Sequence, residues 1–198
     1  MEFIPEELQG LDATLSDTYF CNFSLFQSMP DSWAINQLFP IMPIHRLNEQ
    51  PTKHAVICDI SCDSDGKIDT FIDQRDVKKT LLLHPYDGHH YYLGVFLIGA
   101  YQEILGDLHN LFGDTNAVHV DLNDSGQVEL NQVLKGETVS EVLDYVQFQG
   151  DDLMRRLQTS IDQAVKENRI SIDEAKGFAR FYEEGLKGYT YLEEPDAD

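Results

Sequence analysis

The chain has 198 residues, enough for one domain or slightly more with a hydrophobic core of its own. Its 35 acidic residues outnumber 14 basic ones, and the resulting formal net charge of −21 opposes binding to nucleic acid and to anionic lipid. No apolar run approaches the roughly 18 residues of a membrane span, so we expect no nucleic acid and no membrane among the partners.

The cysteine content and the N-terminus indicate a reducing compartment. Three cysteines, at positions 21, 58 and 62, do not form a pattern typical of a disulfide framework. The first seven residues are acidic and lack the basic and apolar regions of a secretory signal. We therefore expect a cytoplasmic protein.

The first 43 residues alternate between helical and extended patterns. Residues 1–16 are predicted to be the tail of a helix, because Leu8, Leu11 and Leu15 recur at helical spacing without an opening cap. A strand is predicted over 17–27 and a short helix over 30–38, with Pro30 in the first turn. Residues 39–43 contain two prolines and are predicted to be extended.

The central part of the chain has mainly strand patterns. A helix interrupts them between Gly99 and about Asn110, and the sequence Asn123–Gly126 is a strong hairpin turn. The predicted strands are 55–60, 67–72, 79–83, 91–98, 117–122 and 127–130.

After residue 134 the pattern becomes helical. Thr138 with Glu141, and Ser171 with Glu174, have the spacing of capping boxes and predict helices beginning at 138 and 171. A third helix is predicted over 151–168. The last helix is predicted to end at Gly185 or Gly188, because glycine is common after a helix C-terminus.

The stretch 58–66 contains the first candidate for chemistry. A predicted strand ends there in a turn that presents Cys62, Asp63 and Asp65 close together. A lone cysteine is usually a small buried hydrophobic residue, so a purely structural role for Cys62 stays open beside the catalytic one. The acidic neighbours disfavour the thiolate, so Cys62 is better suited to donating a proton than to nucleophilic attack.

A second candidate follows the strand 91–98. Tyr101 lies behind two small residues that allow a large group to approach the backbone, and its hydroxyl is suited to binding a phosphate. Packing as a core or interface aromatic is the alternative. His109 comes two turns later and is expected to border the same pocket.

The histidine-rich and calcium-like patterns do not predict a metal site. His84, His89 and His90 fit no zinc spacing, and we interpret them as solvated loop side chains. The turn at 61–66 has the start of a calcium loop, but Ile72 stands where a bidentate glutamate is required. The sequence therefore predicts no metal ligands.

Two motifs resemble a known enzyme family. Cys62–Gly66 together with Gly99–Tyr101 resembles the C-terminal domain of the pyridoxal-phosphate-dependent decarboxylases of the alanine-racemase type, which act on ornithine, diaminopimelate or arginine. Two longer stretches, 19–35 and 102–114, resemble the biosynthetic arginine decarboxylases in particular. The likeness extends from about residue 17 to Leu192.

The resemblance implies an α+β fold in which a mainly antiparallel β-barrel or sandwich domain carries a C-terminal helical extension. It also implies that the family's TIM barrel is absent from this chain. The implied organisation is the tail of an upstream helical bundle over 1–16, the β domain over 17–134, the helical extension over 135–192 and an acidic tail over 193–198.

The resemblance also implies roles for three side chains, and two further residues are expected to act beside them. Cys62 matches the residue that protonates the carbanion left when carbon dioxide departs. Asp63 matches the acid that receives the cationic end of the substrate across a dimer interface, and Asp65 is expected to be a second acid for guanidinium. Tyr101 matches a contact to the cofactor phosphate, and His109 is expected to contribute to the same cofactor site.

The implied activity is conversion of L-arginine to agmatine and carbon dioxide in polyamine (putrescine and spermidine) biosynthesis. Pyridoxal phosphate is the implied cofactor and Mg²⁺ is expected from the resemblance alone. The implied partners are the barrel domain of the same enzyme and a second subunit. Because the family's barrel carries the Schiff-base lysine, we expect the isolated chain to be inactive.

Two alternatives remain open. The chain could be a free-standing binding or regulatory module that complements or pairs with a barrel-containing decarboxylase. It could also belong to a sister decarboxylase that acts on ornithine or diaminopimelate.

Overall fold

The computed structural model describes residues 10–193, which form two compact units that divide between Asn110 and Leu111. This division lies inside the predicted β domain 17–134. Of the predicted N-terminal helix only α1, Leu11–Thr14, falls among the described residues. Residues 1–9 and 194–198, which contain the rest of that helix and most of the predicted acidic tail, lie outside the described residues.

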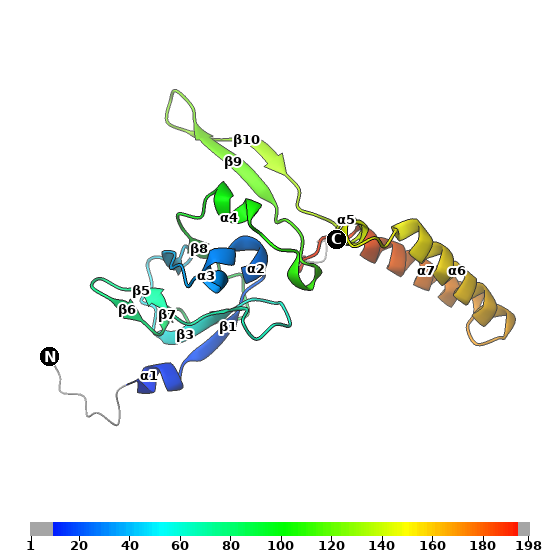
Figure 1. The fold of residues 1–198 in the computed structure, drawn as a ribbon, viewed down its shortest axis with the longest axis horizontal. Coiled ribbons are helices and arrows are strands. Elements are labelled where there is room, and N and C mark those ends of the chain that lie inside the picture. The colour runs from blue at the N-terminus through cyan, green and yellow to red at the C-terminus, as the bar shows by residue number, and fades with distance from the viewer. Residues whose placement is uncertain (1–9, 194–198) are drawn as a thin grey trace. The chain divides into compact units, whose positions relative to one another are not determined.

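A four-stranded sheet forms the centre of the first unit (Figure 1). Its central strand β3, Lys53–Cys58, pairs in parallel with β1, Asp17–Phe20. On its other edge β3 pairs antiparallel with β4, Lys67–Ile68, and with β7, Leu81–Leu83. The strand β3 therefore pairs with segments that lie both before and after it in the sequence.

Two further strand pairs and three short helices complete this unit. The pairs are antiparallel, namely β2 (Ile41–Pro43) with β8 (Leu93–Val95) and β5 (Phe71–Ile72) with β6 (Val77–Lys78). The helices are α2 (Leu25–Ser28), α3 (Pro30–Ala34) and α4 (Ala100–Ile104). The α+β class and the mainly antiparallel pairing are confirmed. Within residues 10–193 the strands close no barrel.

The core of the first unit is apolar and lies against one face of β3. Ala55 and Ile57 alternate with less buried residues along β3, as expected for a strand with one face in the core. Leu81 and Leu83 of β7 are buried beside them, and α2 contributes Leu25. The rest of the buried cluster is Met29, Ile68 and Phe71.

Several predicted elements are shorter than their sequence pattern indicated. The strand predicted over 17–27 ends at Phe20, because Ser24 caps the start of α2 by accepting a hydrogen bond from the Gln27 amide. The helix predicted over 30–38 ends at Ala34, before Asn36 adopts the left-handed conformation with a φ of 56°. In both places side-chain and backbone conformations outweigh the longer periodicity.

The second unit consists of a β-hairpin and three helices (Figure 1). The strand β9, Ala117–Leu122, matches its prediction, whereas β10, Val128–Leu134, continues beyond residue 130. The capping boxes at Thr138 and Ser171 are confirmed. They start α5, Val139–Tyr145, and α7, Ile172–Lys187, and the third helix, α6, spans Gly150–Lys166.

Leu83 is the most sensitive test of the core of the first unit, because its side chain is 0% exposed. Replacing Leu83 by alanine leaves a cavity and is expected to lower the free energy of unfolding by about 2–5 kcal/mol. The matched variant Leu47→Ala removes the same atoms from a side chain that is 69% exposed, and should change it by less than about 0.5 kcal/mol. Urea unfolding followed by circular dichroism checks both, and equal effects would contradict this core.

Candidate active site

The loop after β3 is organised by the buried side chain of Asp59, which is only 2% exposed. One carboxylate oxygen accepts a hydrogen bond from the Leu25 amide at 2.9 Å. The other accepts from the Ser61 amide at 3.0 Å and from the Ser61 hydroxyl at 2.7 Å. These donors compensate a buried carboxylate that would otherwise be unfavourable, and they join the loop to the start of α2.

Gly66 closes the same loop. Its carbonyl accepts a hydrogen bond from the Asp59 amide at 2.8 Å. A Cβ atom at this position would overlap the Asp59 carboxylate, so the close approach requires glycine. Residues 59–66 therefore have a defined backbone on which Cys62, Asp63 and Asp65 are presented.

Asp63 connects this loop to a distant part of the sequence. One oxygen of its carboxylate accepts a hydrogen bond from the Asp65 amide, and the other accepts from Nε2 of His109, both at 2.9 Å. The Asp65 amide, and then the His109 ring, hold the pKa of Asp63 below its ordinary value. The side chain is thus kept as a carboxylate that can receive a cation.

His109 reaches Asp63 because the segment after α4 is tied to α2 and α3. The side chain of Gln102, which is buried, donates to the Asp31 carboxylate at 2.8 Å. The Asp107 amide donates to the Phe26 carbonyl at 3.1 Å. These contacts shorten the predicted helix 99–110, which ends at Ile104 and is followed by a 3₁₀ turn at His109–Leu111.

The Cys62 thiol is exposed and has a defined neighbour. The side-chain amide of Asn110 donates to its sulfur at 3.2 Å. Asn110 itself adopts the left-handed conformation with a φ of 56° and a ψ of 21°. A hydrogen-bond donor is therefore placed at the sulfur atom that the sequence predicts to donate a proton.

Asp65 is held by an aromatic side chain that sequence reasoning did not include in the site. Nε1 of Trp33 donates to the Asp65 carboxylate at 3.3 Å. The indole packs edge-on against the ring of Phe26, with ring centroids 5.3 Å apart, and Phe26 in turn lies 4.3 Å from the ring of His109. The candidate site therefore consists of Cys62, Asp63 and Asp65 with His109, Asn110, Phe26 and Trp33 around them.

Tyr101 lies apart from this group among the described contacts. It is the second residue of α4, and its side chain is 67% exposed. No hydrogen bond or ring contact described for residues 10–193 joins it to the loop 59–66. The structure thus brings four of the five predicted residues together, and the role of Tyr101 stays a prediction.

The histidines of the loop 84–90 are not equivalent. His84 is buried, not solvated as predicted: its ring bonds to the hydroxyl of Tyr91 at 2.7 Å and to the carbonyl of Glu49 at 3.1 Å. Among the described residues, no group of three His, Cys, Asp or Glu side chains is placed to hold a metal ion. Between residues 10 and 193 no helix combines the length and apolar character needed to cross a membrane.

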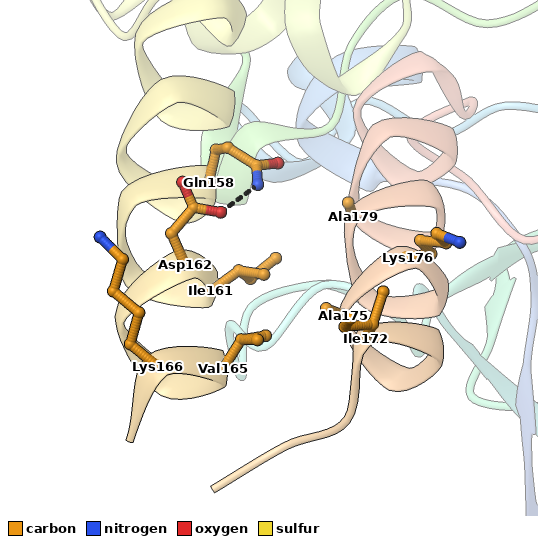
Figure 2. Close-up of a pocket in the computed structure, with 9 residues that line it drawn as sticks. All are labelled: Gln158, Ile161, Asp162, Val165, Lys166, Ile172, Ala175, Lys176 and Ala179. Carbon is orange, nitrogen blue, oxygen red and sulfur yellow. Dashed lines mark hydrogen bonds between the residues drawn. The ribbon is translucent and has the colours of Figure 1, made fainter. Parts of the chain in front are cut away.

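A separate apolar groove lies between α6 and α7 in the second unit (Figure 2). Ile161 and Val165 of α6 point toward α7, where Ile172 and Ala175 lie opposite. Gln158 donates to Asp162 at 2.8 Å on its rim. The groove contains none of the predicted site residues.

Curated proteins with similar sequences match nearly the whole chain. The biosynthetic arginine decarboxylase of Phocaeicola vulgatus is 59% identical over 194 residues, which are 98% of this chain and 31% of that protein. The biosynthetic arginine decarboxylase of Thermosynechococcus vestitus is 54% identical over 96% of this chain and 30% of that protein. The chain thus spans about 30% of the length of the curated relatives it matches.

The family model and the fold agree with these relatives. Residues 139–192 match the model described as the arginine decarboxylase C-terminal helical extension. The crystal structure of the biosynthetic arginine decarboxylase SpeA from Campylobacter jejuni matches with a TM-score of 0.78 and 36% sequence identity. That match covers 89% of this chain and 29% of the crystallised chain.

The pairing of His109 with Asp63 makes a prediction about titration. Because the pKa of Asp63 is lowered in the folded protein, its hydrogen bonds stabilise the fold at neutral pH, and this contribution is lost as the pH falls through the lowered pKa. His109→Phe removes the ring N–H and should raise the pKa of Asp63 toward its ordinary value. It should remain below that value, because the Asp65 amide still donates.

Carboxyl-carbon NMR titration measures this change directly. The control His119→Phe alters a histidine on β9, in the other unit, and should leave the titration of Asp63 unchanged. An unchanged Asp63 titration in His109→Phe would show that the ring does not hold the carboxylate.

Proposed function

Because this chain belongs to the biosynthetic arginine decarboxylase family and corresponds to the C-terminal part of its members, we propose that it is part of a pyridoxal-phosphate-dependent enzyme that converts L-arginine to agmatine and carbon dioxide. In this proposal the product enters polyamine biosynthesis. The chain supplies the proton donor and the acids that bind the substrate. The observation that carries the proposal is that Cys62, Asp63 and Asp65 lie on one loop, where His109 contacts Asp63 and Asn110 contacts Cys62.

Cys62 is the proposed acid. Departure of carbon dioxide breaks the bond between the carboxyl carbon and the α-carbon of arginine and leaves the electron pair on the substrate. The thiol of Cys62 donates its proton to that α-carbon and becomes a thiolate, which solvent then reprotonates. The Asn110 amide, 3.2 Å from the sulfur, orients the thiol and favours the charge that forms there.

Asp63 and Asp65 are the acids proposed to bind the substrate. Guanidinium is planar and presents several N–H donors, and carboxylates bind it through parallel hydrogen bonds. Asp63 is kept ionised by the Asp65 amide and the His109 ring, so it is ready to receive this cation at neutral pH. Its neighbour Asp65 lies two residues away on the same loop.

Tyr101 is the residue proposed to contact the cofactor phosphate. A phosphate requires hydrogen-bond donors, and the exposed hydroxyl of Tyr101 on α4 is such a donor. We propose Tyr101 as the contact to the phosphate. Nε2 of His109 donates to Asp63, so we propose that His109 borders the cofactor site and holds one of the two acids. When bound, pyridoxal phosphate supplies an electron sink for the electron pair that is left on the α-carbon when carbon dioxide departs.

The chain spans about 30% of the length of its relatives, so we propose that the remainder of such a protein supplies the lysine that holds the cofactor. The same proposal includes three further expectations. The enzyme should contain a second subunit, its activity should depend on the cofactor, and it should use Mg²⁺. The isolated chain is then expected to show no decarboxylation.

Substrate choice tests the proposed activity. The complete enzyme, supplied with pyridoxal phosphate, should release carbon dioxide from L-arginine with a higher kcat/KM than from ornithine or diaminopimelate. Chromatographic detection of agmatine identifies the product. A preference for ornithine or diaminopimelate would assign the chain to a sister decarboxylase instead.

The proton-donor role is tested by Cys62→Ala in the same complete enzyme. Loss of a general acid is expected to lower kcat by about 10²–10⁴-fold. The matched control Cys58→Ala removes a thiol from the end of β3, outside the contacts of the site, and should keep most of the activity. If both variants had the same kcat and formed agmatine equally, Cys62 would not be the donor.

A further inference from the structure

Trp33 is the single tryptophan of the chain and lies on α3 beside the acids of the loop. Its side chain is 50% exposed, although indole is among the largest apolar groups. One part of the ring packs on Phe26, a side chain that is itself buried. Packing inside the protein therefore covers only half of the surface of this residue.

The exposed part of the indole is held in a fixed orientation. Its N–H donates to the Asp65 carboxylate at 3.3 Å, and the Phe26 ring contacts it edge-on at an interplanar angle of 68°. Asp65 is joined through its own amide to the Asp63 carboxylate at 2.9 Å. The half-exposed indole thus lies beside two linked carboxylates in the first unit, with its N–H edge toward Asp65.

The contacts that begin at Trp33 form a closed ring. Asp63 accepts from His109, and the ring of His109 lies 4.3 Å from that of Phe26, on which Trp33 packs. Five side chains therefore restrain one another, and none of these contacts depends on residues outside the first unit. Such restraint is what a recognition site needs, because little conformational freedom is lost on binding.

The chemistry of this arrangement distinguishes guanidinium from ammonium. A guanidinium plane stacks on an aromatic face while its edge donates to carboxylates. An alkylammonium is a compact, strongly hydrated charge that carboxylates also attract, but it has no plane to stack. An indole beside two acids therefore favours the planar cation.

We propose that Trp33 is a specificity-determining residue, which selects a guanidinium-bearing substrate over one that ends in a primary amine. This inference rests on the proposed function for the location of the substrate. It adds the aromatic surface to the two acids, and it assigns Trp33 the double role of orienting Asp65 and stacking on the guanidinium.

Kinetics of the complete enzyme with two Trp33 variants test the proposal. Trp33→Leu removes both the ring and the N–H, and should raise the KM for arginine about three- to thirty-fold with a smaller change in kcat. Trp33→Phe restores an aromatic face without the N–H and should recover part of the loss. The control Phe20→Leu removes an exposed aromatic ring on β1 and should leave both constants unchanged.

Calorimetric binding of two product-like cations separates this inference from the proposed function. In Trp33→Leu the affinity for agmatine should fall by a similar factor, whereas the affinity for 1,4-diaminobutane should not change. Equal changes for the two cations, or no change for agmatine, would overturn the role of Trp33. If the unmodified enzyme binds agmatine through Trp33 but does not decarboxylate arginine, the proposed function fails and the inference stands.

Discussion

The candidate site depends on the hydrogen bonds that the buried carboxylate of Asp59 accepts. It accepts hydrogen bonds from Leu25 and from both the amide and the hydroxyl of Ser61. A carboxylate in an apolar surrounding is stable only with such donors, so the start of α2 and the loop after β3 cannot move independently. Gly66 extends the same constraint, because no side chain fits between its backbone and Asp59.

A second set of contacts brings the other half of the site to this loop. The Gln102–Asp31 pair and the hydrogen bond from Asp107 to Phe26 hold the segment after α4 against α2 and α3. This segment carries His109 to Asp63 and Asn110 to Cys62. Asp63 and Cys62, the residues proposed to bind a cation and to donate a proton, are therefore both contacted by the same short segment, which fixes their geometry relative to each other.

Local sequence signals predicted the second unit well. Thr138 and Ser171 satisfy the first amides of their helices whatever the tertiary context, and the turn at 123–126 has few alternatives to a hairpin. The extent of β10 was underestimated, because its pairing with β9 continues past an irregularity between Leu130 and Gln132. Periodicity is interrupted at such a bulge, so strand length there depends on the partner strand.

The sequence by itself determined the neighbourhood of Cys62, Asp63 and Asp65, because residues of one turn stay together in any fold. Its motifs also resembled those of the family, and that resemblance implied the α+β class. Tertiary structure decided that Asp63 meets His109, 46 positions away, and that Asp65 meets Trp33, 32 positions away. It also left Tyr101 exposed on α4. Contacts across such separations depend on how loops are held by buried groups such as Asp59, and no local spacing encodes them.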